Sequence, residues 1–430
     1  MIKLDTVSDE TIELIANSDV AKIHGPPGTG KTSLILRVCE LLLETLDCLK
    51  HIPYYIGTAY ISYTNTATRV AQARFMKMLG YSNDEIKEVL TRKEGYWRTL
   101  HGLCTMTLLK FEDEFAKRIR NTFEKYPNFV EDAVIEFCRK HNVRYDPYDA
   151  TSSLEGNLAF SQKNAIFGEF YTKYYDKQRC LDKLASVNYR SLQIIEMWEE
   201  YKAEQGIVDY DDILIEVMHK DVILPSEVVM LDEAQDLTRL EMAIVAKLIA
   251  GVKKAFVVGD ANQAIYTYKG ANPDIFKNFK ADEEFVLTIT HRLPRRIIDF
   301  STRILRSMLS PVTVTIKTRR GEDQVYRWHA RIEELADYAW EVAARTGKKV
   351  YLLFRTNQMV RRASIHLLRQ GKPFRRLKGI SIFEREVFGV VEAMRVLERG
   401  DIPGEVAMNA LLRVTGGSCR RREGCDKRLC

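Results

Sequence analysis

The chain has 430 residues, which is too long for one ordinary domain and fits two or three. Hydrophobic residues make up 46% and charged residues 29%, as in an ordinary soluble, globular protein. The net charge of +6 permits a polyanionic partner without demanding one, and no apolar run of about 18 residues or signal-peptide pattern is visible, so we expect a cytoplasmic (or nuclear) protein without a membrane partner.

A phosphate-binding motif follows the first predicted strand, residues 20–24. The segment GPPGTGKT fits G-x-x-x-x-G-K-[ST] and precedes residues 32–46, whose apolar side chains share one helical face. Its glycines let backbone N–H groups surround phosphate oxygens, and the helix N-terminus adds positive partial charge. A glycine-rich turn that binds nothing is the alternative. The predicted nucleotide-binding residues are Gly25, Pro26, Pro27, Gly28, Thr29, Gly30, Lys31, Thr32 and Ser33.

The chemistry of this motif calls for ATP and Mg²⁺ as cofactors. Lys31 can reach the β and γ phosphates, and the hydroxyl of Thr32 can ligate Mg²⁺. A carboxylate at the end of a nearby strand is then needed, and VVMLDEAQD supplies Asp232 and Glu233. Asp232 would hold Mg²⁺ through water, and Glu233 would orient or deprotonate the attacking water. Adjacent acids at a strand end can instead cap a helix, which is the structural alternative.

Strands alternating with helices predict an α/β fold with a doubly wound parallel sheet. Residues 54–63, YYIGTAYISY, are apolar or aromatic on both faces, as in a buried parallel strand, and its tyrosines at 54, 55 and 60 are expected in the core. Further strands are predicted at 227–232, 254–260 and 284–290.

Two stretches depart from that first alternating lobe. Between about 110 and 205 the strand signals vanish, and Phe111, Phe115, Ile119 and Phe123 recur every fourth residue, which predicts a helical insertion. After Arg292 the alternation resumes, with strand candidates at 324–330, 348–357 and 372–379 that indicate a second α/β lobe.

Cysteine usage indicates reduced thiols. Five of the eight cysteines are scattered singly through apolar surroundings, and three crowd residues 419–430. Three thiols without a nearby histidine are one ligand short of a zinc site, so we do not expect a metal there.

These segments together resemble the UvrD/Rep/PcrA-like DNA helicases of superfamily 1. LDEAQD (231–236) resembles their Walker B box, and its glutamine distinguishes it from the DEAD and DEAH boxes of superfamily 2. VVGDANQAIYTYKGA (257–271) is similar to their third motif. SYTNTAT, RTLHGL, VDYDDIL and LTITHRLPRRI resemble further motifs, and the match runs in order from about residue 20 to 400.

The resemblance implies two RecA-like lobes with ATP between them and single-stranded DNA across both. The implied parts are residues 1–108 and 206–290 as the first P-loop NTPase lobe, 109–205 as a helical insertion, 291–400 as an incomplete second RecA-like lobe, and 401–430 as an irregular basic tail.

The resemblance also implies residue roles. The catalytic group would be Glu233, Lys31, Gln263 and Arg292, with Gln263 at the γ-phosphate and Arg292 approaching it from the second lobe. The DNA track would be lined by Tyr63, Thr64, Asn65, Thr99, His101 and Tyr268. Tyr268 would stack on a base, which grips DNA without reading its sequence. Arginines at 295, 296, 361 and 362 either contact phosphates or form a solvated face.

The implied function is an ATP-dependent DNA helicase or translocase, moving 3′ to 5′ on single-stranded DNA toward a duplex junction. Three departures qualify it. DETIELIA (9–16) stands where the family reads adenine with a glutamine, and His291 and Leu293 replace a tyrosine and a serine. The family also continues past the equivalent of Arg399 with a K-G-L-E motif and an arginine motif, where this chain reads SCRRREGCDKRLC.

That last segment is either a basic tail or the product of a frameshift or gene break, and we favour the second interpretation. Two alternatives therefore stay open beside the motor. The chain could be an ATP-gated single-stranded DNA-binding protein without unwinding activity, or one half of a split helicase whose partner chain supplies the further motifs.

Overall fold

The structure is a computed structural model that describes residues 2–4, 7–45, 57–92, 95–146, 153–307, 314–318, 320–321 and 324–375. The chain divides into two compact units, one over 1–145 and 152–326 and the other over 146–151 and 327–430. Among the described residues, no helix is long and apolar enough to cross a membrane.

A seven-stranded sheet forms the centre of the first unit, in the order β1-β7-β2-β6-β5-β3-β4. Its strands are β1 (Ile2–Leu4), β2 (Val20–His24), β3 (Gly57–Ser62), β4 (Trp97–Thr99), β5 (Ser226–Leu231), β6 (Lys254–Gly259) and β7 (Glu283–Leu287). All adjacent pairs are parallel, which confirms the predicted fold class. The predicted strands at 20–24, 227–232 and 254–260 coincide with β2, β5 and β6. The strand predicted at 54–63 contains β3, and its first two tyrosines lie outside the described residues.

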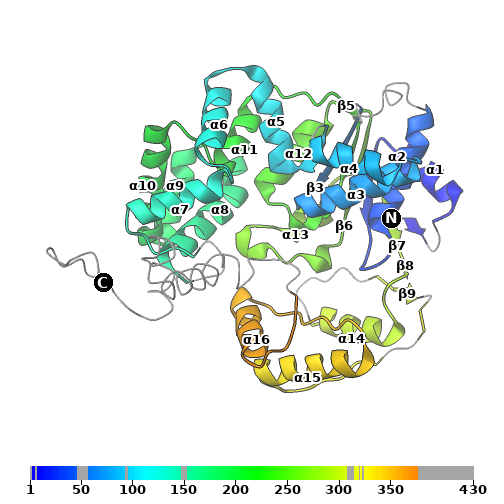
Figure 1. Cartoon of the computed structure of the whole chain (residues 1–430). Coiled ribbons are helices and arrows are strands. Elements are labelled where there is room, and N and C mark those ends of the chain that lie inside the picture. The colour runs from blue at the N-terminus through cyan, green and yellow to red at the C-terminus, as the bar shows by residue number, and fades with distance from the viewer. Residues whose placement is uncertain are drawn as a thin grey trace. The chain divides into compact units, whose positions relative to one another are not determined.

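Helices cover both faces of this sheet (Figure 1). One face packs against α1 (Asp9–Asn17), α2 (Lys31–Thr45), α3 (Asn65–Met78) and α4 (Asn83–Arg92), with Ile35 and Phe75 against Met230 in one buried cluster. The other packs against α5 (Leu100–Leu108), α11 (Tyr210–His219) and α12 (Arg239–Ile249), with Leu103 and Leu240 in a second cluster. Strands buried on both faces explain the continuous apolar runs in the sequence.

Residues 109–205 are helical or irregular wherever they are described. The helices are α6 (Glu114–Lys125), α7 (Val130–Lys140), α8 (Glu155–Tyr174), α9 (Lys177–Val187) and α10 (Tyr189–Gln205), which gather beside α11 in Figure 1. The four residues spaced by four do not lie on one helix: Phe111 ends a short 3₁₀ turn, and Glu112 with φ 55° separates it from α6. Ile119 is buried, whereas Phe111 and Phe123 are exposed.

A buried ion cluster ties these helices together. Nζ of Lys163 in α8 and Nζ of Lys202 in α10 lie 2.8 and 2.9 Å from the same carboxylate oxygen of Asp209, which caps α11. Trp198 Nε1 donates to that oxygen as well, at 2.8 Å. Burial alone would raise the pKa of Asp209, but the two lysines hold it well below its usual range. Removing one partner would leave a buried charge uncompensated.

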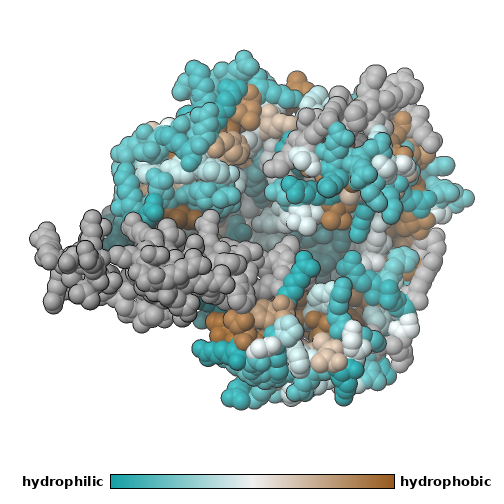
Figure 2. Space-filling view, viewed as in Figure 1, coloured by the Kyte–Doolittle hydropathy of each residue, from teal (hydrophilic) through white to brown (hydrophobic). Residues whose placement is uncertain are grey.

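The second unit contains α15 (Ile332–Thr346) and α16 (Asn357–Arg369), which pack through Ala336, Ala363 and Leu367. Figure 2 shows hydrophobic side chains on the surface over α16. His366 Nε2 and Lys372 Nζ both contact the carboxylate of Asp337, at 2.9 and 2.7 Å.

The strand predictions after Arg292 are not confirmed in the described residues. Residues 324–330 and 348–356 have no strand, 372–375 are irregular, and 376–379 lie outside the described part of the chain. The last position of the second candidate, Asn357, begins α16 and Thr356 caps it. A strand exists through a hydrogen-bonded ladder, which the described parts of these segments lack, although Leu352 and Phe354 pack against the helices α15 and α16 while Leu353 between them is 87% exposed.

Candidate nucleotide site and the loops beside it

The loops that carry the predicted site follow three adjacent strands of the sheet. β2 pairs with β6 and β6 pairs with β5, all parallel, so their carboxyl ends share one edge. This edge is where ligands bind in open α/β sheets. Three sequence motifs thereby meet: GPPGTGKT after β2, DEAQD after β5 and DANQ after β6.

The glycine-rich loop is fixed from several sides. The N–H of Gly25 donates to the carbonyl of Gly259 at 3.0 Å, which fastens the loop to the end of β6. Gly28 and Gly30 adopt φ of 74° and 87°, where residues with a Cβ are strained. Thr29 Oγ1 donates to the carbonyl of Pro26 at 2.8 Å, and Nζ of the buried Lys31 donates to the carbonyl of Gly25 at 2.7 Å. The lysine therefore lies inside the loop that it is predicted to serve.

Thr32 and Asp232 meet although 200 residues separate them. Thr32 Oγ1 donates to Asp232 Oδ2 at 2.6 Å, and the backbone N–H of Glu233 donates to Asp232 Oδ1 at 2.9 Å. Asp232 is 4% exposed, while Ser33, next along the loop, is exposed. These two donors fix the orientation of the Asp232 carboxylate.

Tyr60 supplies a further donor to this carboxylate. Its hydroxyl donates to Asp232 Oδ2 at 2.8 Å. Burial, and then the neighbouring Asp232, raises the pKa of the Tyr60 hydroxyl. The tyrosine is in the core as expected, but sequence reasoning assigned it packing alone.

The oxygen ligands offered here fit Mg²⁺. A hydroxyl and a carboxylate lie side by side at Thr32 and Asp232, and Mg²⁺ binds through one or two carboxylates together with phosphates and water. Within the described ranges, no three His, Cys, Asp or Glu side chains are grouped closely enough to hold a metal by themselves. Four of the cysteines, at 39, 104, 138 and 180, are free and buried, in agreement with the expectation of reduced thiols.

Glu233 has an unusual backbone. It adopts φ 59°, the left-handed region that a residue with a side chain rarely occupies. Its carboxylate accepts a hydrogen bond of 2.8 Å from Nε2 of Gln235. Such strain persists where surrounding structure imposes it and often marks functional sites.

A hydrogen-bonded path leads from Glu233 to Gln263. Gln235 donates to Glu233, and its Oε1 accepts from the N–H of Asp260 at 2.9 Å. Asp260 Oδ2 in turn accepts from Gln263 Nε2 at 2.6 Å. A Cβ on Gly259 would lie 2.7 Å from Gln235 Oε1, so the crossing requires glycine there. The second and third motifs are therefore physically joined.

Arg292 lies beside the glycine-rich loop within the first compact unit. The neighbouring N–H of His291 donates to the carbonyl of Gly28 at 2.9 Å, and Thr290 Oγ1 donates to the carbonyl of Pro27 at 2.8 Å. A Cβ on Gly28 would fall 2.4 Å from Cβ of Arg292. The Arg292 side chain is exposed.

The predicted DNA residues lie at or just after the ends of β3, β4 and β6. The ring of Tyr63 stacks on Tyr266 with centroids 4.3 Å apart, and Tyr266 lies 6.4 Å from the half-exposed Tyr268. Lys269 Nζ lies over both of the latter rings, at 5.6 and 5.8 Å. The predicted DNA contacts Tyr63 and Tyr268 are thus the two ends of a run of three rings, with Tyr266 between them, that joins the segments after β3 and β6.

Two predicted DNA contacts have a local task. Thr64 Oγ1 accepts from the N–H of Ala67 and caps α3, and Thr99 Oγ1 accepts from the N–H of Gly102 and caps α5. Asn65, the first residue of α3, is exposed. His101 is packed edge-on against Tyr210 at 5.2 Å.

The third motif also contacts the helical insertion, which sequence reasoning missed. Gly270 has φ 94°, and a Cβ there would lie 2.9 Å from Cα of Ala165 in α8. Ser161 Oγ donates to the carbonyl of Tyr268 at 3.5 Å. The glycine at position 270 is the only local sign of this close approach in the sequence, and its partner helix is about a hundred residues away.

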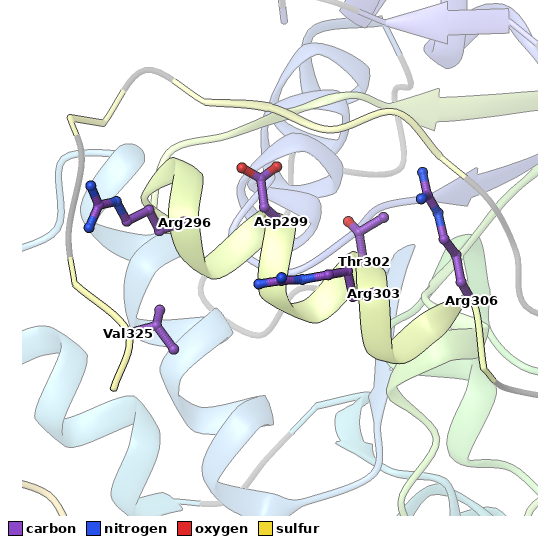
Figure 3. Close-up of a pocket in the computed structure, with 6 residues that line it drawn as sticks. All are labelled: Arg296, Asp299, Thr302, Arg303, Arg306 and Val325. Carbon is purple, nitrogen blue, oxygen red and sulfur yellow. The ribbon is translucent and has the colours of Figure 1, made fainter. Parts of the chain in front are cut away.

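A separate pocket of about 480 Å³ lies along α14 (Arg295–Leu305). It is lined by Arg296, Asp299, Thr302, Arg303, Arg306 and Val325 (Figure 3). Arg295 Nε pairs with Asp299 at 3.1 Å, and in the second unit Arg362 pairs with Glu333 at 2.8 Å. These pairs favour the solvated-face interpretation for Arg295 and Arg362 over phosphate contacts.

A family model described as the UvrD/REP helicase N-terminal domain matches residues 9–284, more than half of the chain. The chain belongs to the UvrD/Rep helicase family. Among similar curated proteins, this UvrD/Rep-family chain is 22% identical to a "Probable DNA helicase II homolog" of Mycoplasma capricolum subsp. capricolum, over 95% of the chain and 57% of the relative. It is 23% identical to "ATP-dependent DNA helicase PcrA" of Leuconostoc citreum and 22% identical to that of Bacillus subtilis, over 87% of the chain and 50% of each relative. The chain thus spans about half the length of the curated relatives it matches.

The family assignment confirms the resemblance drawn from the motifs, and the sheet topology confirms the RecA-like lobe. The roles of individual site residues and the boundaries of the predicted parts stay predictions.

Proposed function

We propose that this UvrD/Rep-family chain is an ATP-dependent DNA helicase or translocase that moves 3′ to 5′ on single-stranded DNA. The observation that carries the proposal is the hydrogen-bonded path from Glu233 through Gln235 and Asp260 to Gln263. Three residues beyond Gln263, Tyr266 is the middle ring of the run of three aromatic rings. A nucleotide-facing loop and a base-stacking surface are thereby parts of one connected segment.

The nucleotide half of the mechanism follows from the positions of the polar groups. Lys31 and the glycine-rich loop would bind the β and γ phosphates. Thr32 and Asp232 would hold Mg²⁺, which when bound neutralises phosphate charge. Glu233 would orient and deprotonate the attacking water, and Gln263 would bind the γ-phosphate. Arg292, beside Gly28, would add positive charge on the same side.

The DNA half of the mechanism would use the aromatic run. Any base offers a π-face, so Tyr268 can stack on successive bases for roughly 1–3 kcal/mol each without selecting sequence. A change at Gln263 would shift the loop that carries Tyr266 and Tyr268, because only a few residues separate them. ATP binding and release would therefore alternate the grip on DNA.

ATPase measurements with and without oligo-dT test the proposal. We expect DNA to stimulate turnover and K31A to abolish nucleotide binding. E233Q should bind ATP with little turnover, because the amide oxygen can still accept the bond from Gln235 but cannot take up a proton. The outcome that overturns the proposal is turnover that neither DNA nor these substitutions change.

Unwinding of a duplex with a 3′ overhang then separates the motor from the two alternatives. DNA-stimulated turnover without unwinding or translocation favours the ATP-gated binding protein. Activity that needs a co-purifying second polypeptide favours the split enzyme, and unwinding by the isolated chain contradicts both.

A further inference from the structure

Outside the predicted machinery, Tyr60 is the donor to Asp232 that no motif names. Tyr60 lies in the middle of β3, where the ladder pairs it with Met230 of β5 and Trp97 of β4. β5 ends one residue before Asp232. A tyrosine side chain at this register is long enough to bring its hydroxyl to the carboxylate, 2.8 Å from Oδ2. A shorter apolar residue would complete the same core without reaching it.

The ring of Tyr60 is held on its open side by a buried aromatic stack. Trp97 stacks on Tyr60 with centroids 5.1 Å and planes 20° apart, and Phe75 of α3 stacks on Trp97 at 5.1 Å. Trp97 Nε1 donates to Thr58 Oγ1 at 3.0 Å, which fixes the indole in turn. These three rings are at most 4% exposed. The sheet and the aromatic stack therefore fix the position of the hydroxyl.

The second hydroxyl on Asp232 Oδ2 differs in this respect. Thr32 lies in the first turn of α2, directly after the glycine-rich loop, and is itself the predicted Mg²⁺ ligand, so the direction of its O–H depends on what the site binds. The hydroxyl of Tyr60 can donate a single hydrogen bond, and it donates that bond to Asp232. Hydrogen-bond partners behind a metal-binding group orient it, and their loss usually weakens metal binding roughly 10–100-fold.

We propose that Tyr60 is a positioning residue for the Mg²⁺–nucleotide complex: its hydroxyl holds the carboxylate of Asp232 in the orientation that the metal requires. This inference rests on the proposed nucleotide site and deepens it. In this proposal Tyr60 acts through Asp232 and is not itself a ligand of the metal or the phosphates.

The test is the Mg²⁺ dependence of nucleotide binding, measured with a fluorescent ATP analogue in the full chain, without turnover. Y60F keeps the ring stack and removes only the hydroxyl. We expect it to bind the analogue as the wild type does without metal, and to need roughly tenfold more Mg²⁺ for the metal-dependent increase in affinity. Mn²⁺ binding with ADP, followed by electron paramagnetic resonance, should weaken in parallel.

The matched control is Y126F. The hydroxyl of Tyr126 is also buried and bonds to Tyr201 at 2.9 Å in the helical insertion, far along the chain from Asp232. Both variants lose one buried hydroxyl, and thermal midpoints measure that loss in each. If the hydroxyl of Tyr60 were only structural, Y60F would resemble Y126F in its unchanged Mg²⁺ dependence, and the proposal would be overturned.

A pair of non-natural residues covers the case in which Y60F does not fold. Replacing Tyr60 with para-aminophenylalanine or para-methylphenylalanine fills the same volume with and without a donor. The amine should keep a nearly wild-type Mg²⁺ requirement, and the methyl should raise it. Equal requirements in the two variants overturn the inference, whereas a wild-type chain without Mg²⁺-dependent nucleotide binding refutes the proposed function instead.

Discussion

Asp236 closes the DEAQD loop as a buried carboxylate with few donors. Its Oδ1 accepts from the N–H of Ile265 at 3.3 Å, and the side chain is 7% exposed. Burial raises its pKa to about 6, from an ordinary value of 3.8, and negative charge at Glu233 acts in the same direction. The loop that joins the second and third motifs therefore contains a group that resists ionisation.

The sign of the resulting pH dependence follows from proton binding. Because the folded state holds this proton more tightly, Asp236 contributes most to stability below about pH 4 and loses that contribution as the pH rises through about 6. D236N removes the charge and keeps the oxygen acceptor for Ile265. We expect the free energy of unfolding of D236N, relative to that of the wild type, to increase as the pH rises from about 4 to 7. Urea denaturation measures both values.

The exposed Asp182 of α9 provides the control, because D182N also removes a carboxylate but at the surface. A D236N difference that is constant across this pH window contradicts the predicted cost of a buried charge.

At the scale of residues, the sequence predicted those contacts that a recognised motif implies. The P-loop order placed Lys31 and Thr32 beside one another, and Asp232 was expected near them. The contact of Tyr60 with Asp232 could not be foreseen, because it spans 172 residues and depends on which strands are neighbours. An apolar run containing a tyrosine predicts only that the residue is buried.

At the scale of elements, Gly270 shows why one turn must approach a helix closely. It combines φ 94° with a position 2.9 Å from backbone of α8, measured from where a Cβ would stand. Gly80 has a similar φ of 85° with no atom within 4 Å of its Cβ position. Substitutions at these two glycines therefore distinguish the cost of the backbone conformation from the cost of the steric contact.

We expect G80A to lower the free energy of unfolding by roughly 1–2 kcal/mol, the cost of the left-handed conformation alone. G270A should cost more, because α8 must also move, and should weaken DNA binding by displacing Tyr268. Denaturant titration and oligo-dT binding measure the two effects. If G80A and G270A lose equal stability, the backbone at Ala165 can move away from residue 270 at little cost, and the prediction is contradicted.

The same scale explains which elements the sequence could reveal. β2, β5 and β6 have five or six mostly buried residues each, long enough to be visible as apolar runs. β1 and β4 have three residues each and were missed, because three residues establish no period. The candidate at 348–357 has the composition of a strand, but composition does not supply the neighbour that a ladder requires.

At the scale of the whole molecule, the net charge of +6 does not identify which lysine and arginine side chains would contact DNA. Arg295 and Arg362 are each paired with an acid on their own unit. We therefore expect R295A and R362A to leave the salt dependence of oligo-dT affinity unchanged. Each phosphate contact on a single strand contributes about 0.7 to the slope of log affinity against log salt.

K269A provides the comparison, because Lys269 lies over the rings of Tyr266 and Tyr268. Its slope should become shallower by about 0.7. Shallower slopes for R295A or R362A would instead restore the phosphate-contact interpretation of those arginines.

The position of β2 in the sheet has a consequence for synthesis on the ribosome. Its two neighbours are β6 and β7, which follow it by more than two hundred residues. Chains grow at roughly 5–20 residues per second, so the strand before the P-loop waits at least ten seconds for a ladder partner. Helices α8, α9 and α10 pack on one another and can begin to fold during that interval, although α8 also packs against α12, which is made later. Nascent chains shorter than about 260 residues therefore lack β6, on which both β2 and the glycine-rich loop depend.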